Sequence, residues 1–208
     1  MTAAQLVVLR HGRTAWNASG RFQGQADIPL DERGVAQAER AAEVLAELAP
    51  AEIVSSDLSR ARQTAEPLAR LTAVAVRTDP RLREISVGSW EGLTIEQALA
   101  TMSPPDAEAY LAGEDVRRSP TGETVAEVAA RASEALAEIG ARAEPGSTVV
   151  VVMHGLAGKV GVAQLVGLPN DCWRALGSLH NCGWISVERH RTGDYWRISD
   201  YNVTAPRS

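Results

Sequence analysis

The chain has 208 residues, enough to bury a substantial core in one domain. Hydrophobic residues make up 45% of it, an ordinary fraction for a globular protein, and the formal net charge of −5 argues against a nucleic-acid-binding protein. The longest weakly charged stretch, Pro145–Asn170, contains Lys159 and several glycines, so we expect a strand, a turn and a helix there and no membrane span. The expected partner is a small molecule, with no nucleic acid and no membrane.

Cysteine usage indicates a reducing compartment. Met1–Leu9 is too short for the apolar region of a signal peptide, so we expect a cytoplasmic protein in which Cys172 and Cys182 are reduced and pack as small hydrophobic residues. The sequence contains neither a C-x-x-C nor an H-E-x-x-H motif, so no metal and no cofactor are expected.

The first half of the chain alternates short apolar runs with stretches of helical spacing. Asp31 is placed to cap the first long helix. The expected elements are a strand at Leu6–Leu9, a helix at Asp31–Leu48, a strand at Glu52–Ser55, a helix at Asp57–Leu71 and a strand at Thr72–Arg77.

The second half begins with an irregular segment. Ser103–Thr121 is rich in proline and charge, so we interpret the region around residues 86–121 as an inserted lid with a short helix near Asp106–Leu111. The later expected elements are a helix at Glu123–Arg142, a strand at Thr148–Met153, a helix at Gly155–Val166 and a hairpin of Trp184–Arg189 and Tyr195–Tyr201 around Thr192–Asp194. This alternation predicts a single domain, residues 1–208, with an α/β fold: a three-layer α/β/α sandwich around a mostly parallel sheet.

An arginine and a histidine follow the first strand directly. Arg10 and His11 would lie at the carboxyl end of that strand, the edge where ligands bind in open α/β sheets, and Gly12 allows close approach. A guanidinium lowers the pKa of a neighbouring imidazole, so His11 should be neutral near pH 7 and able to accept a phosphoryl group, while Arg10 suits a phosphate dianion. Taken alone, such a pair is more typical of an ordinary surface loop.

A second arginine lies at the start of the helix that follows the second strand. Ser55, Ser56 or Asp57 can cap this helix, and Arg60 falls in its first turn. A helix N-terminus favours an anion, and an arginine there adds a bidentate clamp. Arg62 lies two residues further on and faces another direction, so we interpret it as a solvated helix residue.

A glutamate and a second histidine complete the candidate set. Glu84 lies in a glycine-containing loop and is a candidate general acid, although a lone glutamate there is more often a surface carboxylate. The run Val149–Val152 is typical of a central strand buried on both faces. That strand would deliver His154 to the same sheet edge as His11. Packing alone does not readily explain two histidines at one edge.

The complete pattern resembles the histidine phosphatase (phosphoglycerate mutase-like) superfamily, and the resemblance covers essentially the whole chain. The motifs that carry it are Leu9–Thr14 with Trp16–Asn17, Arg21–Gly24 with Asp27–Leu30, Ser55–Ala65, Leu82–Glu84 and Met153–Gly155. One such motif would be weak, but five in this order are specific. The resemblance implies a phosphoglycerate mutase-like fold and a phosphatase that needs no metal.

The resemblance also implies a role for each matching residue. His11 would become a phosphohistidine, and Glu84 would protonate the leaving alkoxide and later activate water. Two guanidinium groups and an imidazolium would stabilise the charge on the phosphoryl oxygens. The phosphate-binding set would comprise Arg10, His11, Asn17, Gln23, Arg60, Glu84, His154 and Gly155.

The sequence leaves three functions open. A metal-independent phosphomonoester hydrolase is favoured over a cofactor-dependent phosphoglycerate mutase, because mutases of the family are larger in the region corresponding to Val87–Thr121. A non-catalytic phospho-ligand-binding domain is disfavoured because all five catalytic groups are present. Arg117 and Arg118 could contact a substrate carboxylate or form a solvated pair. Nothing in the sequence demands a homodimer, although one through an edge strand or helix is common in such proteins.

The end of the chain is similar to a subgroup of the family that acts on glucosyl-3-phosphoglycerate, so this compound or another sugar or glycerate phosphate is a candidate substrate. The similar residues are Gln23–Gln25, Leu168–Pro169, Trp173, Ala175–Gly177, Asn181 and Trp184. Leu156 departs from the family, which commonly has glycine there, and is expected to narrow the mouth of the pocket. The aromatic residues Trp16, Phe22 and Trp90 are candidates for a sugar-facing wall or for plain packing.

Overall fold

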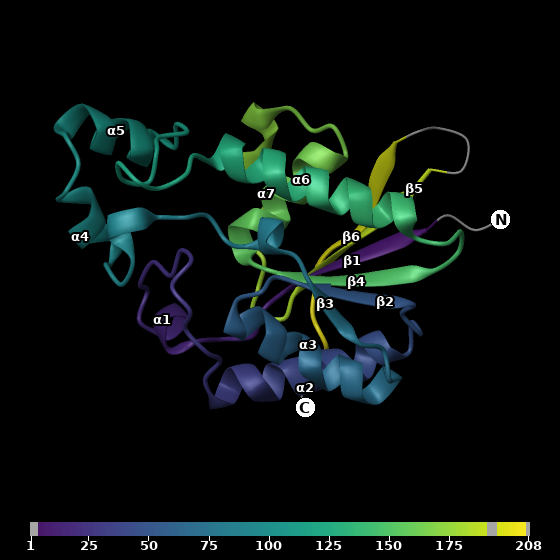
Figure 1. The fold of residues 1–208 in the computed structure, drawn as a ribbon. Helices are drawn as coiled ribbons and strands as arrows, with labels where there is room; N and C mark the ends of the chain where they lie inside the picture. The colour runs from purple at the N-terminus through teal and green to yellow at the C-terminus, as the bar shows by residue number, and fades with distance from the viewer. Residues whose placement is uncertain (1–3, 191–194, 207–208) are drawn as a thin grey trace.

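A computed structural model describes residues 4–190 and 195–206 of the chain. Its centre is one six-stranded sheet with the strand order β3-β2-β4-β1-β5-β6 (Figure 1). Strands β1 to β4 run parallel to one another, and β5 is antiparallel to both of its neighbours. The strands are β1 (Gln5–Arg10), β2 (Glu52–Ser55), β3 (Val76–Thr78), β4 (Thr148–Met153), β5 (Trp184–Arg189) and β6 (Trp196–Val203).

Helices cover both faces of this sheet, so the predicted three-layer α/β/α sandwich is confirmed. Figure 1 shows α2 (Glu32–Ala46) and α3 (Ser59–Thr72) on one face, with α6 (Val125–Arg142) and α7 (Gly155–Leu165) on the other. Smaller helices lie beyond the sheet. They are α1 (Ala15–Ala18), α4 (Ile95–Leu99), α5 (Pro104–Ala112) and the 3-10 turns η1 (Pro80–Leu82), η2 (Gly88–Trp90) and η3 (Asn170–Ala175).

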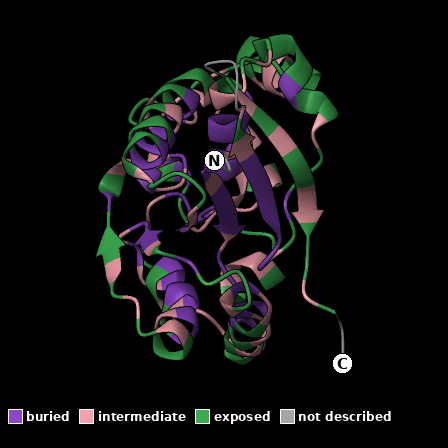
Figure 2. Ribbon diagram, turned by 90° about the vertical axis from the view of Figure 1, so that its right-hand side faces the viewer, coloured by how far each residue is buried: buried purple, intermediate pink, exposed green. Residues whose placement is uncertain are grey.

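The core is divided by the sheet because successive side chains of a strand point to opposite faces. In β1, Leu6 and Val8 pack under α6 and α7, whereas Val7 and Leu9 pack against α2 and α3. The valines of β4 alternate in the same way and are fully buried, as the continuous apolar run predicts (Figure 2). Burial on both faces makes β1 and β4 the fixed centre of the molecule.

Two local expectations were wrong. Helix α3 continues to Thr72, so the strand predicted at Thr72–Arg77 is only the three residues of β3. The helix is ended by Ala73, which has a left-handed φ of 56°, and β3 pairs with β2 alone at the sheet edge. None of the predicted serine or aspartate caps begins α3, since its N-cap is Leu58, which makes no side-chain capping bond. Asp31 caps α2 as expected.

The segment 86–121 lies beyond the carboxyl ends of the parallel strands, beside α1 (Figure 1). The helix predicted near Asp106–Leu111 is α5, begun by Ser103 as its N-cap and ended by Gly113. Sequence reasoning missed α4 and α1, which are only five and four residues long. Such short helices depend on their caps more than on an apolar stripe. In both, a threonine and the third helical residue form a capping box.

The two late strands β5 and β6 pair antiparallel as predicted, while the turn expected at Thr192–Asp194 lies outside the described residues. Figure 2 shows that β6 is exposed along the outer edge of the sheet. Within the described residues, no helix is both long and apolar enough to cross a membrane.

Candidate active site

A cavity of about 300 Å³ opens at the carboxyl edge of the sheet. Six of the predicted site residues line it, together with residues from the α1 loop and from the segment 86–121. The lining residues are Arg10, His11, Asn17, Arg21, Phe22, Gln23, Gly24, Arg60, Glu84, Ile85, Val87, Tyr110, Arg118 and Leu156. The predicted residues His154 and Gly155 lie behind this wall.

His11 presents one ring nitrogen to the cavity. Its backbone N–H donates to the carbonyl of Met153, 3.0 Å away, which ties the end of β1 to the end of β4. The ring Nδ1 lies 2.7 Å from the carbonyl oxygen of Gly12, which can only accept, so Nδ1 carries the proton and Nε2 has a free lone pair. Burial, and then the Arg60 and Arg10 guanidinium groups, lower the pKa of His11 well below its ordinary 6.5. The ring is therefore held in its neutral form, as its neighbours in the sequence suggested.

Arg10 has a buried donor with no protein partner. Its guanidinium donates through Nη1 to the carbonyl of Leu179, while Nε is buried and makes no hydrogen bond. A Cβ at position 155 would lie 3.2 Å from that Nε, so Gly155 allows the arginine to pass close to the start of α7. A buried N–H that lacks an acceptor is costly, and an anion in the cavity would supply one.

Arg60 is fully buried and forms the floor beside His11. It donates from Nη1 to the carbonyl of Ala26 at 2.7 Å and from Nη2 to that of Gly24 at 2.8 Å. These bonds hold the guanidinium plane, and each Nη atom keeps a second N–H. Arg62 is exposed, as interpreted from its spacing.

His154 supports Arg60 from behind. Its Nδ1 accepts a hydrogen bond from Arg60 Nε at 3.2 Å, so the proton lies on Nε2, which is 2.9 Å from Ser56 Oγ. Burial, then Arg60 and the neighbouring His11, lower the pKa of His154 well below 6.5. The prediction that this ring is an imidazolium was therefore wrong, because the fully buried ring lies among positive groups. The rings of His11 and His154 lie edge to face, with centroids 5.2 Å apart.

Glu84 sits at the N-terminus of α7, on the opposite wall. Its Oε1 accepts from the backbone N–H groups of Ile85 and Ala157, both at 3.0 Å, and Oε2 accepts from Leu156 at 3.1 Å. These three bonds fix the position of the carboxyl group beside the cavity. Oε2 has a single donor and is the freer oxygen.

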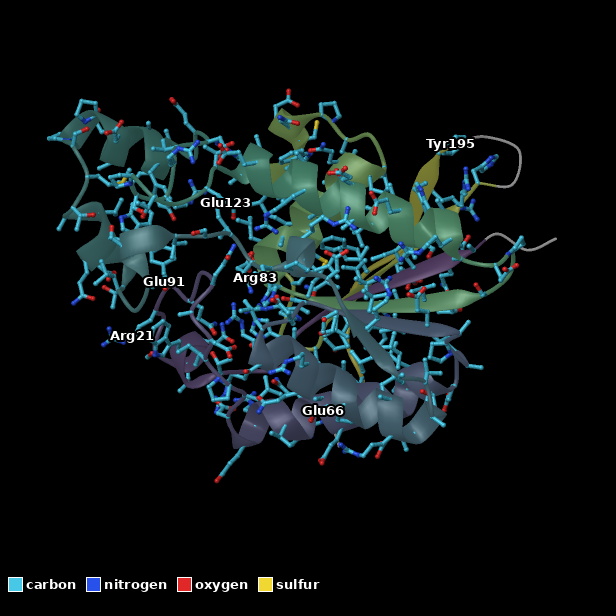
Figure 3. The ribbon with its side chains drawn as sticks, in the orientation of Figure 1. Arg21, Glu66, Arg83, Glu91, Glu123 and Tyr195 are labelled. Carbon is cyan, nitrogen blue, oxygen red and sulfur yellow. The ribbon has the colours of Figure 1, made fainter. Side chains whose placement is uncertain are left out.

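Sequence reasoning missed the residue that holds the Glu84 loop. Arg131 of α6 donates to the carbonyls of Arg81, Arg83 and Glu84 at 2.6–2.9 Å, and it pairs with Glu123 at 2.8 Å. On the other side of the loop, Arg83 forms an ion pair with Asp57 at the start of α3 (Figure 3). An arginine on a helix with negative neighbours gives no sequence signal of such a role.

Asn17 and Gln23 both line the cavity, as the resemblance implies. Thr14 connects them: its hydroxyl donates to Gln23 Oε1 at 3.0 Å, and its backbone N–H donates to Asn17 Oδ1 at 3.2 Å. Because both amide oxygens are occupied, the amide nitrogens are the ends available to a ligand.

The outer part of the cavity is formed by groups that sequence reasoning left open or missed. Tyr110 of α5 and Arg118 lie together, with the guanidinium 4.9 Å from the ring centroid. Arg21 comes from the opposite side and donates to the carbonyl of Gly92 at 2.5 Å; Figure 3 shows it at the rim near Glu91. Arg117 instead forms an ion pair with Glu127 and does not line this cavity.

The aromatic candidates divide. Phe22 lines the cavity, but Trp90 is almost fully buried behind it and packs on both Phe22 and Tyr110. Trp16 does not line the cavity either; its ring lies near Gly92. Leu156 lines the cavity, and the narrowing of its mouth stays a prediction.

The two cysteines are free and differ in burial. Cys182 packs in the core as expected, and burial raises the pKa of its thiol to about 12. Cys172 is exposed, so its predicted role as a packed residue was wrong. Among the described residues, no group of three or more His, Cys, Asp or Glu side chains is placed to hold a metal ion.

Comparison with known proteins assigns the chain to a family. Residues 6–204 match the Histidine phosphatase superfamily (branch 1). The chain belongs to this superfamily.

Its relatives include proteins with different names. It is 41% identical to a glucosyl-3-phosphoglycerate phosphatase of Mycobacterium tuberculosis, over 99% of this chain and 97% of the relative. It is 35% identical to a probable phosphoglycerate mutase of Erwinia tasmaniensis, over 96% and 90% of the two chains. A solved structure of mycobacterial glucosyl-3-phosphoglycerate phosphatase with VO3 superposes with a TM-score of 0.86 at 40% identity, covering 96% of this chain and 99% of that one. The predicted fold and phosphatase class are thereby confirmed.

Proposed function

We propose that this histidine phosphatase hydrolyses a phosphomonoester through a phosphohistidine on Nε2 of His11. The supporting observation is that Nδ1 is held by the Gly12 carbonyl, which leaves Nε2 unprotonated beside Arg10 and Arg60. Two fixed guanidinium groups stabilise charge on the equatorial oxygens during phosphoryl transfer. The unpartnered Nε of Arg10 would bind one of these oxygens.

In the first step, the Nε2 lone pair forms a bond to phosphorus as the bond to the alkoxide oxygen breaks. A protonated Glu84 gives its proton to that oxygen, so the alcohol leaves neutral. In the second step, water attacks phosphorus, Glu84 takes a proton from it, and the P–N bond breaks to release phosphate. His154 acts through Arg60 in this scheme, because it lies behind the guanidinium and not at the cavity surface.

A mutase would instead return the phosphoryl group to the acceptor. We favour hydrolysis because the segment 86–121 is short, with two small helices and one 3-10 turn. Incubation with 3-phosphoglycerate separates the two activities: free phosphate indicates hydrolysis, and 2-phosphoglycerate indicates a mutase.

The proposed substrate is glucosyl-3-phosphoglycerate or another sugar or glycerate phosphate. Its support is the outer cavity, where Arg118 and Arg21 add positive charge beyond the groups assigned to phosphate and where Phe22 and Tyr110 give apolar surface. A leaving group with a carboxylate and a carbohydrate face fits such a wall. The names of the mycobacterial relatives agree with this proposal.

The reaction is tested with His11→Ala. The wild-type enzyme should release phosphate from p-nitrophenyl phosphate and carry acid-labile phosphate after rapid quenching. The variant should do neither, with a loss of at least about 10³-fold. Turnover that survives in the variant would contradict the proposal.

The substrate class is tested with Arg118→Ala and its sequence neighbour Arg117→Ala as a matched control. With glucosyl-3-phosphoglycerate, Arg118→Ala should raise KM by roughly tenfold, because a hydrogen bond between two charged groups is lost. The same variant should change the KM for p-nitrophenyl phosphate little, and Arg117→Ala should change neither. Equal effects of both variants on both substrates would argue against a carboxylate contact at Arg118.

A homodimer and a cytoplasmic location stay predictions. Light scattering of the purified protein measures the first, and cell fractionation measures the second.

A further inference from the structure

Asn181 lies under the active site without touching the cavity. It belongs to the segment between η3 and β5, and its side-chain Nδ2 is 3.2 Å from the backbone oxygen of His11 and 3.2 Å from Oδ1 of Asn17. It therefore connects the loop that carries the nucleophile to a side chain that faces the ligand.

The chemistry of these contacts defines the orientation of two amides. A backbone carbonyl only accepts hydrogen bonds, so the Asn181 atom facing His11 must be the amide nitrogen. The second hydrogen of that nitrogen needs an acceptor, so Asn17 must present its oxygen to Asn181. The amide nitrogen of Asn17 is then the end that faces the cavity.

Besides Asn181, only one other group among the described residues donates a hydrogen bond to Oδ1 of Asn17. Oδ1 also lies 3.3 Å from the Thr14 hydroxyl, but that hydroxyl has one hydrogen, and Gln23 Oε1 is nearer at 3.0 Å. The Thr14 backbone N–H and the Asn181 amide are left to hold the oxygen. Of these two donors, only Asn181 is a side chain that substitution can remove.

We propose that Asn181 is a positioning residue that turns the donor end of the Asn17 amide toward the substrate phosphate. This inference rests on the proposed function only in taking the cavity as a phosphate site. Without Asn181, only the Thr14 backbone N–H holds the Asn17 oxygen. The amide is then freer to rotate and present its oxygen to the anion, which would repel it. Asn181 itself does not touch the substrate.

The test is calorimetric binding of inorganic phosphate to four proteins: wild type, Asn17→Ala, Asn181→Leu and the double variant. Leucine has the same number of side-chain heavy atoms as asparagine, branched at the same carbon, and it removes both hydrogen bonds of the amide. Each single variant should weaken phosphate binding by roughly tenfold, as expected for one hydrogen bond to a charged group. If Asn181 acts through Asn17, the double variant should be no weaker than Asn17→Ala alone.

The same variants are assayed with p-nitrophenyl phosphate. Asn17 would bind phosphate equally in the ground and transition states, so Asn181→Leu should raise KM and leave kcat within about twofold. If Asn181→Leu does not fold, Asn181→Ala replaces it in the same cycle.

Asn202→Ala is the control for a loosened segment. Asn202 accepts from the N–H of His180 at 2.8 Å and donates to the carbonyl of Ser178 at 3.2 Å, so it braces the same segment without touching Asn17. Any loss of phosphate affinity caused by Asn202→Ala should multiply with the loss caused by Asn17→Ala.

The inference would be overturned if the losses of phosphate affinity caused by Asn181→Leu and Asn17→Ala multiplied in the double variant. An unchanged phosphate affinity in Asn181→Leu would overturn it as well. Failure of the proposed function would give a different result. A wild-type protein that binds phosphate but has no turnover would contradict the proposed function, and the phosphate affinities of the four proteins could still be compared.

Discussion

At the scale of single residues, the polar groups of the site are held by atoms that can act only as hydrogen-bond donors or only as acceptors. The Gly12 carbonyl assigns the proton of His11 to Nδ1, and Arg60 assigns that of His154 to Nε2. Sequence reasoning identified both histidines, yet only the tertiary contacts distinguish His11, which lines the cavity, from His154, which braces Arg60. The reason is that a ring's tautomer depends on neighbours far along the chain.

Glu84→Gln tests the proton-transfer role at this scale. Glutamine keeps the side-chain shape but has no acidic proton, so kcat for an alkyl phosphate such as glucosyl-3-phosphoglycerate should fall by about 10²–10³-fold. The loss should be much smaller for p-nitrophenyl phosphate, because nitrophenolate leaves without protonation. Steady-state assays with both substrates provide the comparison. Equal losses would indicate that Glu84 acts by position and not by proton transfer.

At the scale of elements, the loop that follows His11 lies in close contact with the start of α2. A Cβ at Gly12 would lie 2.5 Å from the carbonyl oxygen of Gly34, and a Cβ at Gly34 would lie 2.0 Å from that of Arg13. A side chain at either position would therefore overlap the backbone of the other segment. The sequence indicated that Gly12 allows close approach, but it did not show that the approaching group is a helix.

Gly34→Ala should therefore destabilise the protein and disturb the site. Alanine gains about 1 kcal/mol of helix propensity over glycine. Overlap with the Arg13 carbonyl should outweigh this gain and give a net loss of about 1–3 kcal/mol in the free energy of unfolding. Urea unfolding measures the loss, and kcat/KM should fall with it.

Gly177→Ala is the control, since a Cβ there meets nothing within 4 Å and the position has no positive φ. A Gly34→Ala protein as stable as wild type would show that the loop can yield.

At the scale of the whole molecule, two neutral histidines lie buried between two layers of helices. Their pKa values are lowered below 6.5, mainly by burial, whereas in the unfolded chain they titrate near that value. Below pH 6.5, the unfolded chain then binds more protons than the folded one. Stability should fall as the pH drops from 6.5 toward 5 and should be unaffected by these groups above about pH 7.5.

The measurement is urea unfolding at pH 7.5, 6.5 and 5.5, with His11→Asn as the comparison. Each histidine protonated only in the unfolded chain contributes a slope of at most about 1.4 kcal/mol per pH unit. Asparagine can still donate to the Gly12 carbonyl but does not titrate, so the slope should be roughly halved. A slope identical to wild type would assign the pH dependence to other groups.

The sequence by itself determined the strand-helix alternation, the strands that end in His11 and His154, and the six predicted site residues that line the cavity. Local patterns suffice for these features because a buried strand, a helix cap and a motif each depend on residues that are close together in the sequence. The tertiary structure alone decided that His154 stands behind Arg60, that Arg118 and not Arg117 reaches the cavity, and that Arg131 and Asn181 hold the site. The roles of His154, Arg131 and Asn181 come from hydrogen bonds between residues that lie 47 to 170 positions apart, and no local pattern records such contacts.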